Sequence, residues 1–329
     1  MGGFLSELGK KLAERWLSLL VLPGALYLAV AATARALGHT HPFDLPNLTQ
    51  QISTWANHPA ASTAGGQVVL LAAILAAAAA TGLAAQALGS LTEWLCLAAD
   101  WPAWPAPLRQ LAAKQTIRRR NRWTDAARTW HRHRERDAQT RRHQRADPAP
   151  RQAAERTMTR IAPEEPSRPT WSGDRLNAVA VRLERDHHLD LAILWPHLWL
   201  ILPEETRTQI TTARQNLTRA TTLTAWALLY LPLTAWWWPA ALITATLTLI
   251  GWARTRTATD TYALLLEATA RLHTSGLADR LGLNPTSPFP PETGDNLGLN
   301  PSGPLTPEIG DTLTHHLTPT PPPPPPITG

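Results

Sequence analysis

The feature that most constrains this chain is a charge-free interval that runs from Arg219 to Arg254. Two apolar segments fill it, 221–238 and 239–253, and they meet at the sequence WWWP at 236–239. Proline ends a helix, and tryptophan favours the interface between lipid and water. We therefore expect a hydrophobic hairpin that enters a membrane. At about 1.5 Å per residue the second arm is only about 21 Å long, which leaves a full crossing or a re-entrant hairpin open.

Two more apolar segments precede the hairpin. Residues 17–34 are uncharged, and residues 68–99 begin with a long uncharged run. A bilayer core of about 30 Å needs about 20 apolar residues of helix, so both segments are predicted to be spans. A basic amphipathic helix is expected over 1–16 and a polar extracytoplasmic loop over 35–67. The first span could instead be the apolar core of a cleaved signal peptide that ends at the Ala-Thr-Ala of 32–34.

Positive charge predicts the orientation of these segments. Of the 31 Lys and Arg residues, 23 lie between residues 109 and 219, whereas the loop at 35–67 has a single arginine. Because cytoplasmic loops of membrane proteins are enriched in Lys and Arg, we predict that both termini and the large central region are cytoplasmic. The fold class is therefore expected to be all-α: a multi-pass protein of the plasma (inner) membrane with four transmembrane helices.

The segment 100–170 is the most basic part of the chain. Residues 109–160 carry 16 Lys and Arg against five Asp and Glu. With few large apolar side chains to bury, its helix is expected to be solvated or to lie on a surface, and a linker is expected over 147–170. Such charge predicts binding to the anionic lipid headgroups of the bilayer. A protein partner is an alternative; nucleic acid is disfavoured because no nucleic-acid-binding motif accompanies the three arginines at 118–120.

Residues 171–220 are predicted to form a helical module just before the hairpin. Its apolar run is interrupted by Pro196, which we expect to start a short helix. Another helix is expected over 254–283. Residues 284–329 contain a 16-residue repeat in two copies and a run of six prolines, which predict a disordered tail prone to polyproline II structure.

Two sets of residues stand out as candidate contacts. In the helical module, polar and aromatic residues are candidates to meet a partner, although packing and helix capping against the membrane explain them better. That set is Asp174, Arg175, Asp190, Trp195, Pro196 and Arg207. In the second span, small residues at helical spacing predict close helix–helix packing, although an alanine-rich sequence would place small residues on every face in any case. That set is Ala78, Gly82, Ala85 and Gly89.

The helical module also carries a resemblance. Its motifs are Asp174-Arg175-Leu176-Asn177, Leu189-Asp190, Leu194-Trp195-Pro196, Leu202-Pro203 and Arg207. This block is similar to one in a group of uncharacterised bacterial (actinobacterial-type) multi-pass membrane proteins, where it precedes a hydrophobic hairpin. His187 departs from the group, which often has tyrosine there. The resemblance covers residues 171–252, and it implies an architecture but no activity.

No motif for enzymatic chemistry accompanies this architecture. The chain has no P-loop, nucleophile elbow or HExxH sequence, and its single cysteine excludes an intrachain disulfide. His131 and His133 are two residues apart on an expected helix and so point apart. We therefore expect no enzyme, no cofactor and no metal site. The leading hypothesis is a membrane-anchored scaffold, sensor or adaptor. The alternative is an oligomeric pore or channel, although the apolar runs lack the charged residues that usually mark an ion path.

Overall fold

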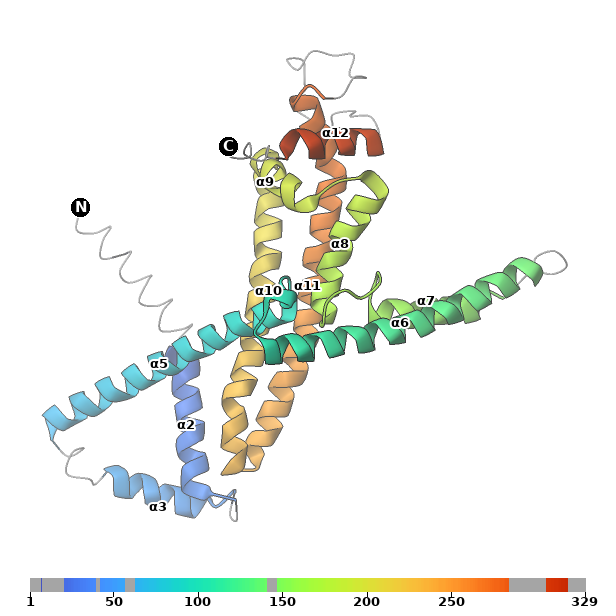
Figure 1. Ribbon diagram of the computed structural model, residues 1–329. Coiled ribbons are helices and arrows are strands. Elements are labelled where there is room, and N and C mark those ends of the chain that lie inside the picture. Colours follow the sequence, from blue (N-terminus) through green and yellow to red (C-terminus); the bar gives the residue numbers. More distant parts are fainter. Residues whose placement is uncertain are drawn as a thin grey trace, which may run out of the picture. The chain divides into compact units, whose positions relative to one another are not determined.

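The computed structural model describes Glu7 and residues 21–39, 42–56, 63–140, 147–283 and 306–318. Within these residues all regular structure is helical and strands are absent, which confirms the all-α class (Figure 1). The chain divides into two compact units. Unit 1 comprises the residues up to Leu95 together with Leu217–Thr255, and unit 2 comprises Cys96–Asn216 together with the residues from Arg256 onward.

Unit 1 is built from helices that meet through small residues. It contains α2 (Leu22–Leu37), α3 (Leu45–Ala56), most of α5 (Ala64–Leu97), and parts of α10 (Glu204–Tyr230) and α11 (Pro239–Arg280), with the 3₁₀ turn η3 (Leu231–Ala235). A Cβ added at Gly24 of α2 would lie 2.0 Å from the carbonyl oxygen of Ala78 in α5. Only a glycine allows two helix backbones to come this close. Helix α2 also packs against the end of α10, where the rings of Tyr27 and Tyr230 meet edge to face at 5.2 Å.

Several threonine hydroxyl groups in unit 1 bond to their own helix backbone. In α11, Thr246 donates to the carbonyl oxygen of Leu242 at 2.8 Å, and Thr248 donates to that of Thr244 at 2.7 Å. These bonds need no partner from another helix, since a threonine side chain reaches the carbonyl four residues earlier.

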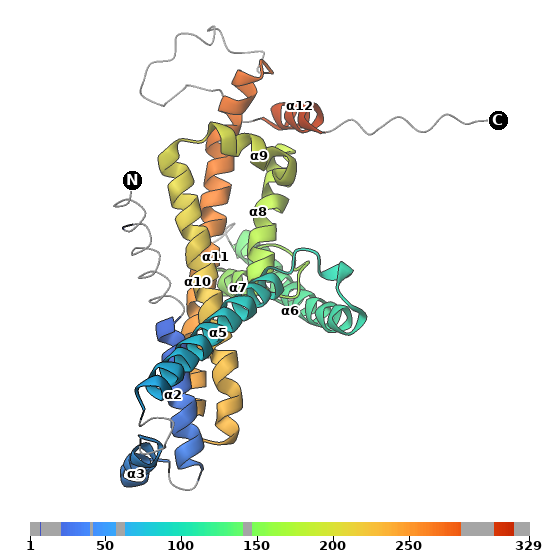
Figure 2. The ribbon, with the colours of Figure 1, turned by 90° about the vertical axis from the view of Figure 1, so that its left-hand side faces the viewer.

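Unit 2 contains the longest basic helix and a compact apolar core. Its elements are η2 (Trp101–Ala103), α6 (Ala106–Thr140), α7 (Ala149–Ile161), α8 (Trp171–His187), α9 (Leu191–Ile201), α12 (Pro307–Leu317) and the remaining parts of α10 and α11. Helices α6 and α7 lie side by side (Figures 1 and 2). The core is formed by α8, α9, α11 and α12 with the short α8–α9 connection. Its buried residues are Val179, Leu183, Leu189, Leu194, Leu198, Ala263, Ala270, Leu277, Ala278 and Leu313.

Two expected boundaries fall inside continuous helices. The module predicted to end at residue 220 continues through α10 to Tyr230, and the helix predicted to begin at 254 is the continuation of the second hairpin arm in α11. Neither position has a glycine or proline that would stop a helix, so helical hydrogen bonding continues through the change from polar to apolar sequence. The WWWP sequence does lie at the hairpin turn: residues 236–238 follow η3, and Pro239 is the first residue of α11. The α-helix of the first arm, predicted to run to 238, ends earlier, at Tyr230, and continues as η3.

Three segments that were expected to lack regular structure contain helices. Helix α3 lies in the predicted loop 35–67, α7 in the predicted linker 147–170, and α12 in the predicted disordered tail 284–329. Those predictions are wrong for these residues, because each helix has apolar side chains at helical spacing. In α12 the residues Ile309, Leu313 and Leu317 pack against the core of unit 2. The rest of the tail and the amphipathic helix predicted over 1–16, apart from Glu7, lie outside the described residues.

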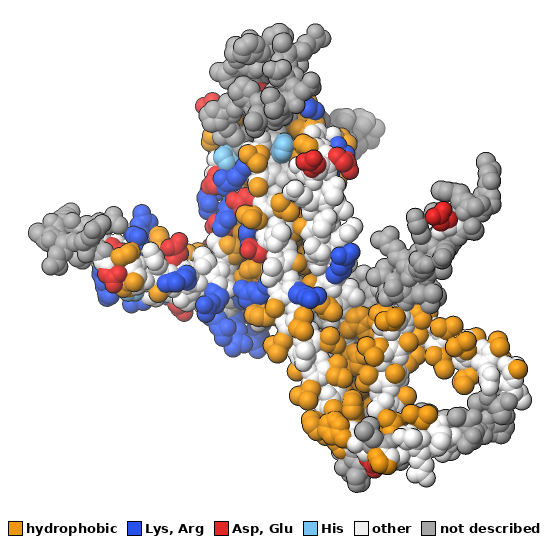
Figure 3. Space-filling view, turned by 180° about the vertical axis from the view of Figure 1, so that it is seen from behind, with side chains coloured by type: hydrophobic (Ala, Val, Ile, Leu, Met, Phe, Trp, Pro, Cys, Tyr) orange, Lys and Arg blue, Asp and Glu red, His pale blue; other side chains and the backbone are white. Residues whose placement is uncertain are grey.

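One helix among the described residues, α5, is long and apolar enough to cross a membrane. Helices α2 and α9 are apolar but shorter, and the first four residues of the span predicted at 17–34 lie outside the described part. The four predicted spans are therefore not confirmed as a set. Hydrophobic side chains gather on the surface of unit 1 (Figure 3). On α5 the exposed fraction is 70% for Val69 and 60% for Leu71.

Candidate functional site: an aromatic groove in unit 2

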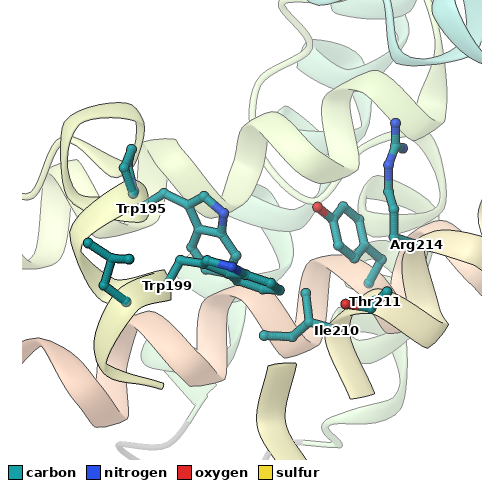
Figure 4. A pocket seen from close by; sticks show the side chains of 8 residues that line it. Trp195, Trp199, Ile210, Thr211 and Arg214 are labelled. Atoms are coloured by element: carbon teal, nitrogen blue, oxygen red, sulfur yellow. The ribbon is translucent and has the colours of Figure 1, made fainter. Parts of the chain in front are cut away.

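An aromatic groove lies between α9, α10 and α11 (Figure 4). Trp195 and Trp199 are one helical turn apart on α9, and their ring centroids are 6.0 Å apart with planes at 44°. Tyr262 of α11 contributes a third ring. The groove is open to solvent and has a cavity volume of about 580 Å³. Its lining residues are Trp195, Pro196, Trp199, Leu200, Ile210, Thr211, Arg214 and Tyr262.

The local sequence of α9 explains why both indole rings face the groove. Asp190 is the N-cap, and its carboxylate accepts hydrogen bonds from the backbone N–H groups of Ala192 at 2.8 Å and Ile193 at 3.4 Å. The helix therefore begins before Pro196, and the prediction that Pro196 starts it is wrong. Leu194 and Leu198 are buried in the core. Because successive helical residues differ by about 100°, the tryptophans that follow each leucine occupy the adjoining face.

Positive charge lies at one side of the groove. The guanidinium carbon of Arg214 is 5.9 Å from the centroid of the Tyr262 ring, which is within the range of a cation–π contact. The floor is supplied by Ile210, which is buried. Ring faces and indole N–H groups suit a ligand that is apolar but carries hydrogen-bond acceptors.

Asp174 is buried at the junction of α6, α8 and the segment that precedes α8. One carboxylate oxygen accepts a hydrogen bond from the guanidinium of Arg119 at 2.7 Å. The other accepts from the backbone N–H groups of Ser167 at 2.9 Å and Arg168 at 2.8 Å. The same arginine, Arg119, donates to the carbonyl oxygen of Ile161 at 2.8 Å. Asp174 therefore joins three segments of unit 2 and has its acceptors occupied.

The other polar candidates also stabilise the fold. Arg175 pairs with Asp260 of α11 at 2.5 Å. Arg207 donates to the carbonyl oxygen of Leu202, the residue that follows α9, at 2.9 Å. Together with the capping role of Asp190, these contacts favour packing and capping for four of the six candidates. Trp195 and Pro196 are the two that reach the groove.

A second ion-pair network was not anticipated from the sequence. Arg182 of α8 pairs with Glu164 at 2.9 Å and with Glu267 of α11 at 3.3 Å. Burial acts to lower the pKa of Arg182, but these two carboxylates raise it above its ordinary value. Nearby, a hydrogen bond from Arg185 lowers the pKa of Asp186. Both shifts favour the charged forms, so this network fastens α8 to α11.

The small residues of the second predicted span are all buried in α5. Ala78 meets α2 at Gly24, and an added Cβ at Gly89 would lie 3.0 Å from the hydroxyl oxygen of Thr222 in α10. This stripe therefore packs against helices of its own chain within unit 1. Glu93, on the same helix, is also buried and was missed as a core residue.

The sequence identified only part of the groove. Trp199 repeats Trp195 four residues later, and this spacing was a signal for a shared helix face. Arg214 and Tyr262 carried no such signal, because their proximity depends on the packing of α10 against α11. Among the residues that the structure describes, no three His, Cys, Asp or Glu side chains come together in a way that could hold a metal ion.

No family model, curated protein or solved structure matches the chain. The resemblance of residues 171–252 to bacterial multi-pass membrane proteins therefore stays a prediction. The function is accordingly inferred from the residues of the chain and their contacts.

Proposed function

We propose that this protein is a non-enzymatic scaffold or adaptor anchored in the plasma membrane. In this proposal unit 1 lies in the bilayer as a multi-pass bundle, with α2, α5 and the two arms of the hairpin as its four spans. Unit 2 is cytoplasmic, with both termini on that side, and it binds anionic lipid headgroups and a protein partner. The observation that carries the proposal is the distribution of small and large apolar side chains in unit 1.

Helix α5 buries its small residues and exposes its large ones. Ala78 and Ala85 are buried, whereas the exposed fraction is 70% for Val69, 60% for Leu71 and 54% for Leu83. Only 22% of its most apolar stretch is buried. A soluble protein buries large apolar side chains, and a contiguous apolar surface marks contact with a membrane or a partner. In lipid this arrangement is favourable, because small residues allow close helix packing while large ones face the acyl chains.

The same pattern continues over the other helices of unit 1. Large apolar side chains of α2, of the hairpin turn and of the first part of α11 are exposed by 53% to 68%. They are Leu22, Leu26, Leu231, Trp236, Leu242, Leu249 and Trp252. This exposed apolar surface favours a bundle of four spans rather than a single crossing by α5.

The first half of α6 has the character of a helix that lies on an anionic membrane surface. Lys114, Arg118 and Arg122 are exposed on one face together with Leu108 and Leu111, whose exposed fractions are 41% and 65%. Helix α6 begins nine residues after α5 ends, so this face belongs to the juxtamembrane part of the chain. Basic residues near an anionic membrane contribute about 1 kcal/mol each to binding. The scaffold assignment is further supported by the polar candidates, which form caps and ion pairs.

The proposal is tested with the full-length protein in lipid nanodiscs, by hydrogen–deuterium exchange. Adding phosphatidylglycerol to phosphatidylcholine should slow exchange over 108–122, and about 1 M salt should reverse the effect, because the Debye length is then only about 3 Å. The variant Arg118→Gln/Arg122→Gln should lose this lipid dependence. The control Arg132→Gln/Arg134→Gln removes the same charge from the far half of α6 and should keep it.

Two results would contradict the proposal. Equal exchange over 108–122 in both lipid compositions would remove the headgroup-binding role of α6. Release of the protein from membranes by an alkaline carbonate wash would refute the bilayer location of unit 1, because an integral bundle resists that treatment.

A further inference from the structure

The aromatic groove and the proline run at 321–326 have no role in the proposed function. The groove has three aromatic rings, one arginine and an open cavity. The proline run follows α12 by three residues. We propose that Pro321–Pro326 of this same chain binds in the aromatic groove as a polyproline II helix. This inference is independent of lipid binding by α6.

The chemistry of the groove matches a polyproline II ligand. Such a helix has no internal hydrogen bonds, so its carbonyl groups accept bonds from donors such as indole N–H groups, and its flat proline rings stack on aromatic faces. Two residues of polyproline II rise about 6.2 Å. The ring centroids of Trp195 and Trp199 are 6.0 Å apart, which matches the axial separation of two prolines that lie on adjoining faces of this three-residue-per-turn helix. A cavity of about 580 Å³ lies within the usual size range of ligand sites.

Helix α12 packs against α9, the helix that carries the two tryptophans of the groove. Leu313 of α12 is buried in one cluster with Leu194 and Leu198, the residues that precede the two tryptophans on α9. Thr314 donates to the carbonyl oxygen of His188, just before α9, at 3.1 Å. The described residues that precede the proline run, 307–318, are therefore fastened to α9 and to the connection before it.

The length of the tether suffices. The four residues from Thr318 to Pro321 extend to about 13 Å, and the six prolines add about 19 Å as polyproline II. Helix α9 has 11 residues and is about 16 Å long. The run can therefore reach either tryptophan from the end of α12.

The proline run of the same chain has two advantages over a separate proline-rich peptide: it is tethered close to the groove, and it is stiff. A short linker gives the run an effective concentration in the millimolar range. Proline has a fixed φ angle, so little conformational entropy is lost when the run binds. Suppose that the free proline run binds the groove with a Kd of about 100 µM. At an effective concentration of about 1 mM, the ratio of occupied to empty grooves is then about ten.

The test uses a fluorescent synthetic peptide with the sequence of residues 317–329 and measures its anisotropy. The peptide is titrated against the complete protein and against a protein that lacks residues 319–329, both in nanodiscs. The shortened protein should bind the peptide, and the complete protein should bind it about tenfold more weakly because its own run occupies the groove. A peptide with glycine and serine in place of the six prolines should bind neither protein.

Variants locate the binding to the groove. In the shortened protein, Trp199→Leu should weaken peptide binding at least tenfold. The matched control is Trp236→Leu, which alters an indole of unit 1 that is 53% exposed and should leave peptide binding unchanged. A melting curve of each variant distinguishes loss of the site from loss of the fold.

A second measurement leaves the aromatic side chains of the groove intact. Spin labels are placed at Leu200→Cys, on the groove rim, and at Thr328→Cys, in a Cys96→Ser background. Electron–electron resonance should give a narrow distance distribution, which becomes broad when the six prolines are replaced with glycine and serine. An equally broad distribution in both proteins would overturn the proposal.

Three further outcomes would also overturn the proposal. Failure of the shortened protein to bind the peptide would show that the groove does not take polyproline, as expected if lipid fills it. Equal binding by both proteins would show that the groove is not covered by its own tail. If the weaker peptide binding by the complete protein disappeared on dilution, the occupant of the groove would be the tail of a second copy.

Discussion

Replacing Asp174 with alanine tests the contact that joins α6 to α8. The side chain of Asp174 is 3% exposed and that of its partner Arg119 is 15% exposed, at a separation of 2.7 Å. Removing the carboxylate leaves a buried guanidinium unpaired, which costs about 3–5 kcal/mol. The backbone N–H groups of Ser167 and Arg168 also lose their acceptor, but water can replace it because neither residue is fully buried. We therefore expect a loss of about 4 kcal/mol in local stability.

Hydrogen exchange of α8 amides in the full-length protein measures this loss as a free energy of opening. The control is Asp125→Ala, which breaks a pair between side chains more than 70% exposed and should change stability by less than about 0.5 kcal/mol. Arg119→Met added to Asp174→Ala should recover part of the loss, because the unpaired charge is then gone. A loss below about 1 kcal/mol for Asp174→Ala, or no recovery in the double variant, would refute the reasoning.

Four further predictions concern backbone contact and pH. Gly310→Ala would place a Cβ 1.7 Å from the carbonyl oxygen of His187, so α12 should undock and its amides should lose exchange protection; protection retained over 307–317 would contradict this. Gly24→Val should separate α2 from α5 and lower the melting temperature in detergent, whereas Gly276→Ala, with open space at the Cβ, should stabilise α11 by about 0.5–1 kcal/mol. Burial lowers the pKa of His273 below its ordinary value of 6.5. The unfolded chain therefore takes up the proton first, so stability should fall as pH drops below about 6.5, and His273→Gln should flatten that dependence in denaturant titrations.

Features that depend on neighbouring residues were predictable from the sequence. Pro203 stands directly before α10, and Glu204 and Glu205 form its acidic first turn. The buried residues Ile210, Ala213 and Leu217 follow at helical spacing. Proline geometry, acidic first turns and helical spacing are properties of a few consecutive residues. A single sequence displays them directly.

Features that depend on distant residues were not predictable. Asp174 and Arg119 are 55 positions apart, and nothing in either segment identifies the other as its partner. Helix α12 was missed for a different reason, because the proline content of the surrounding tail outweighed an 11-residue segment with Ile309, Leu313 and Leu317 on one face. The aromatic groove combines both cases, since Trp195 and Trp199 were within reach of a local pattern and Tyr262 was not.

The threonines of α11 make its mean hydropathy a poor measure of how apolar the surface of this helix is. A hydropathy scale scores Thr246 and Thr248 as polar, yet each hydroxyl is bonded to its own helix and presents mainly a methyl group to its surroundings. Transfer of such a side chain into hydrocarbon leaves no hydrogen bond unmade, so the usual penalty for a hydroxyl is much reduced. The second arm of the hairpin is therefore more lipophilic than its composition suggests. A hydropathy cut-off chosen for leucine-rich helices underestimates the affinity of this arm for hydrocarbon.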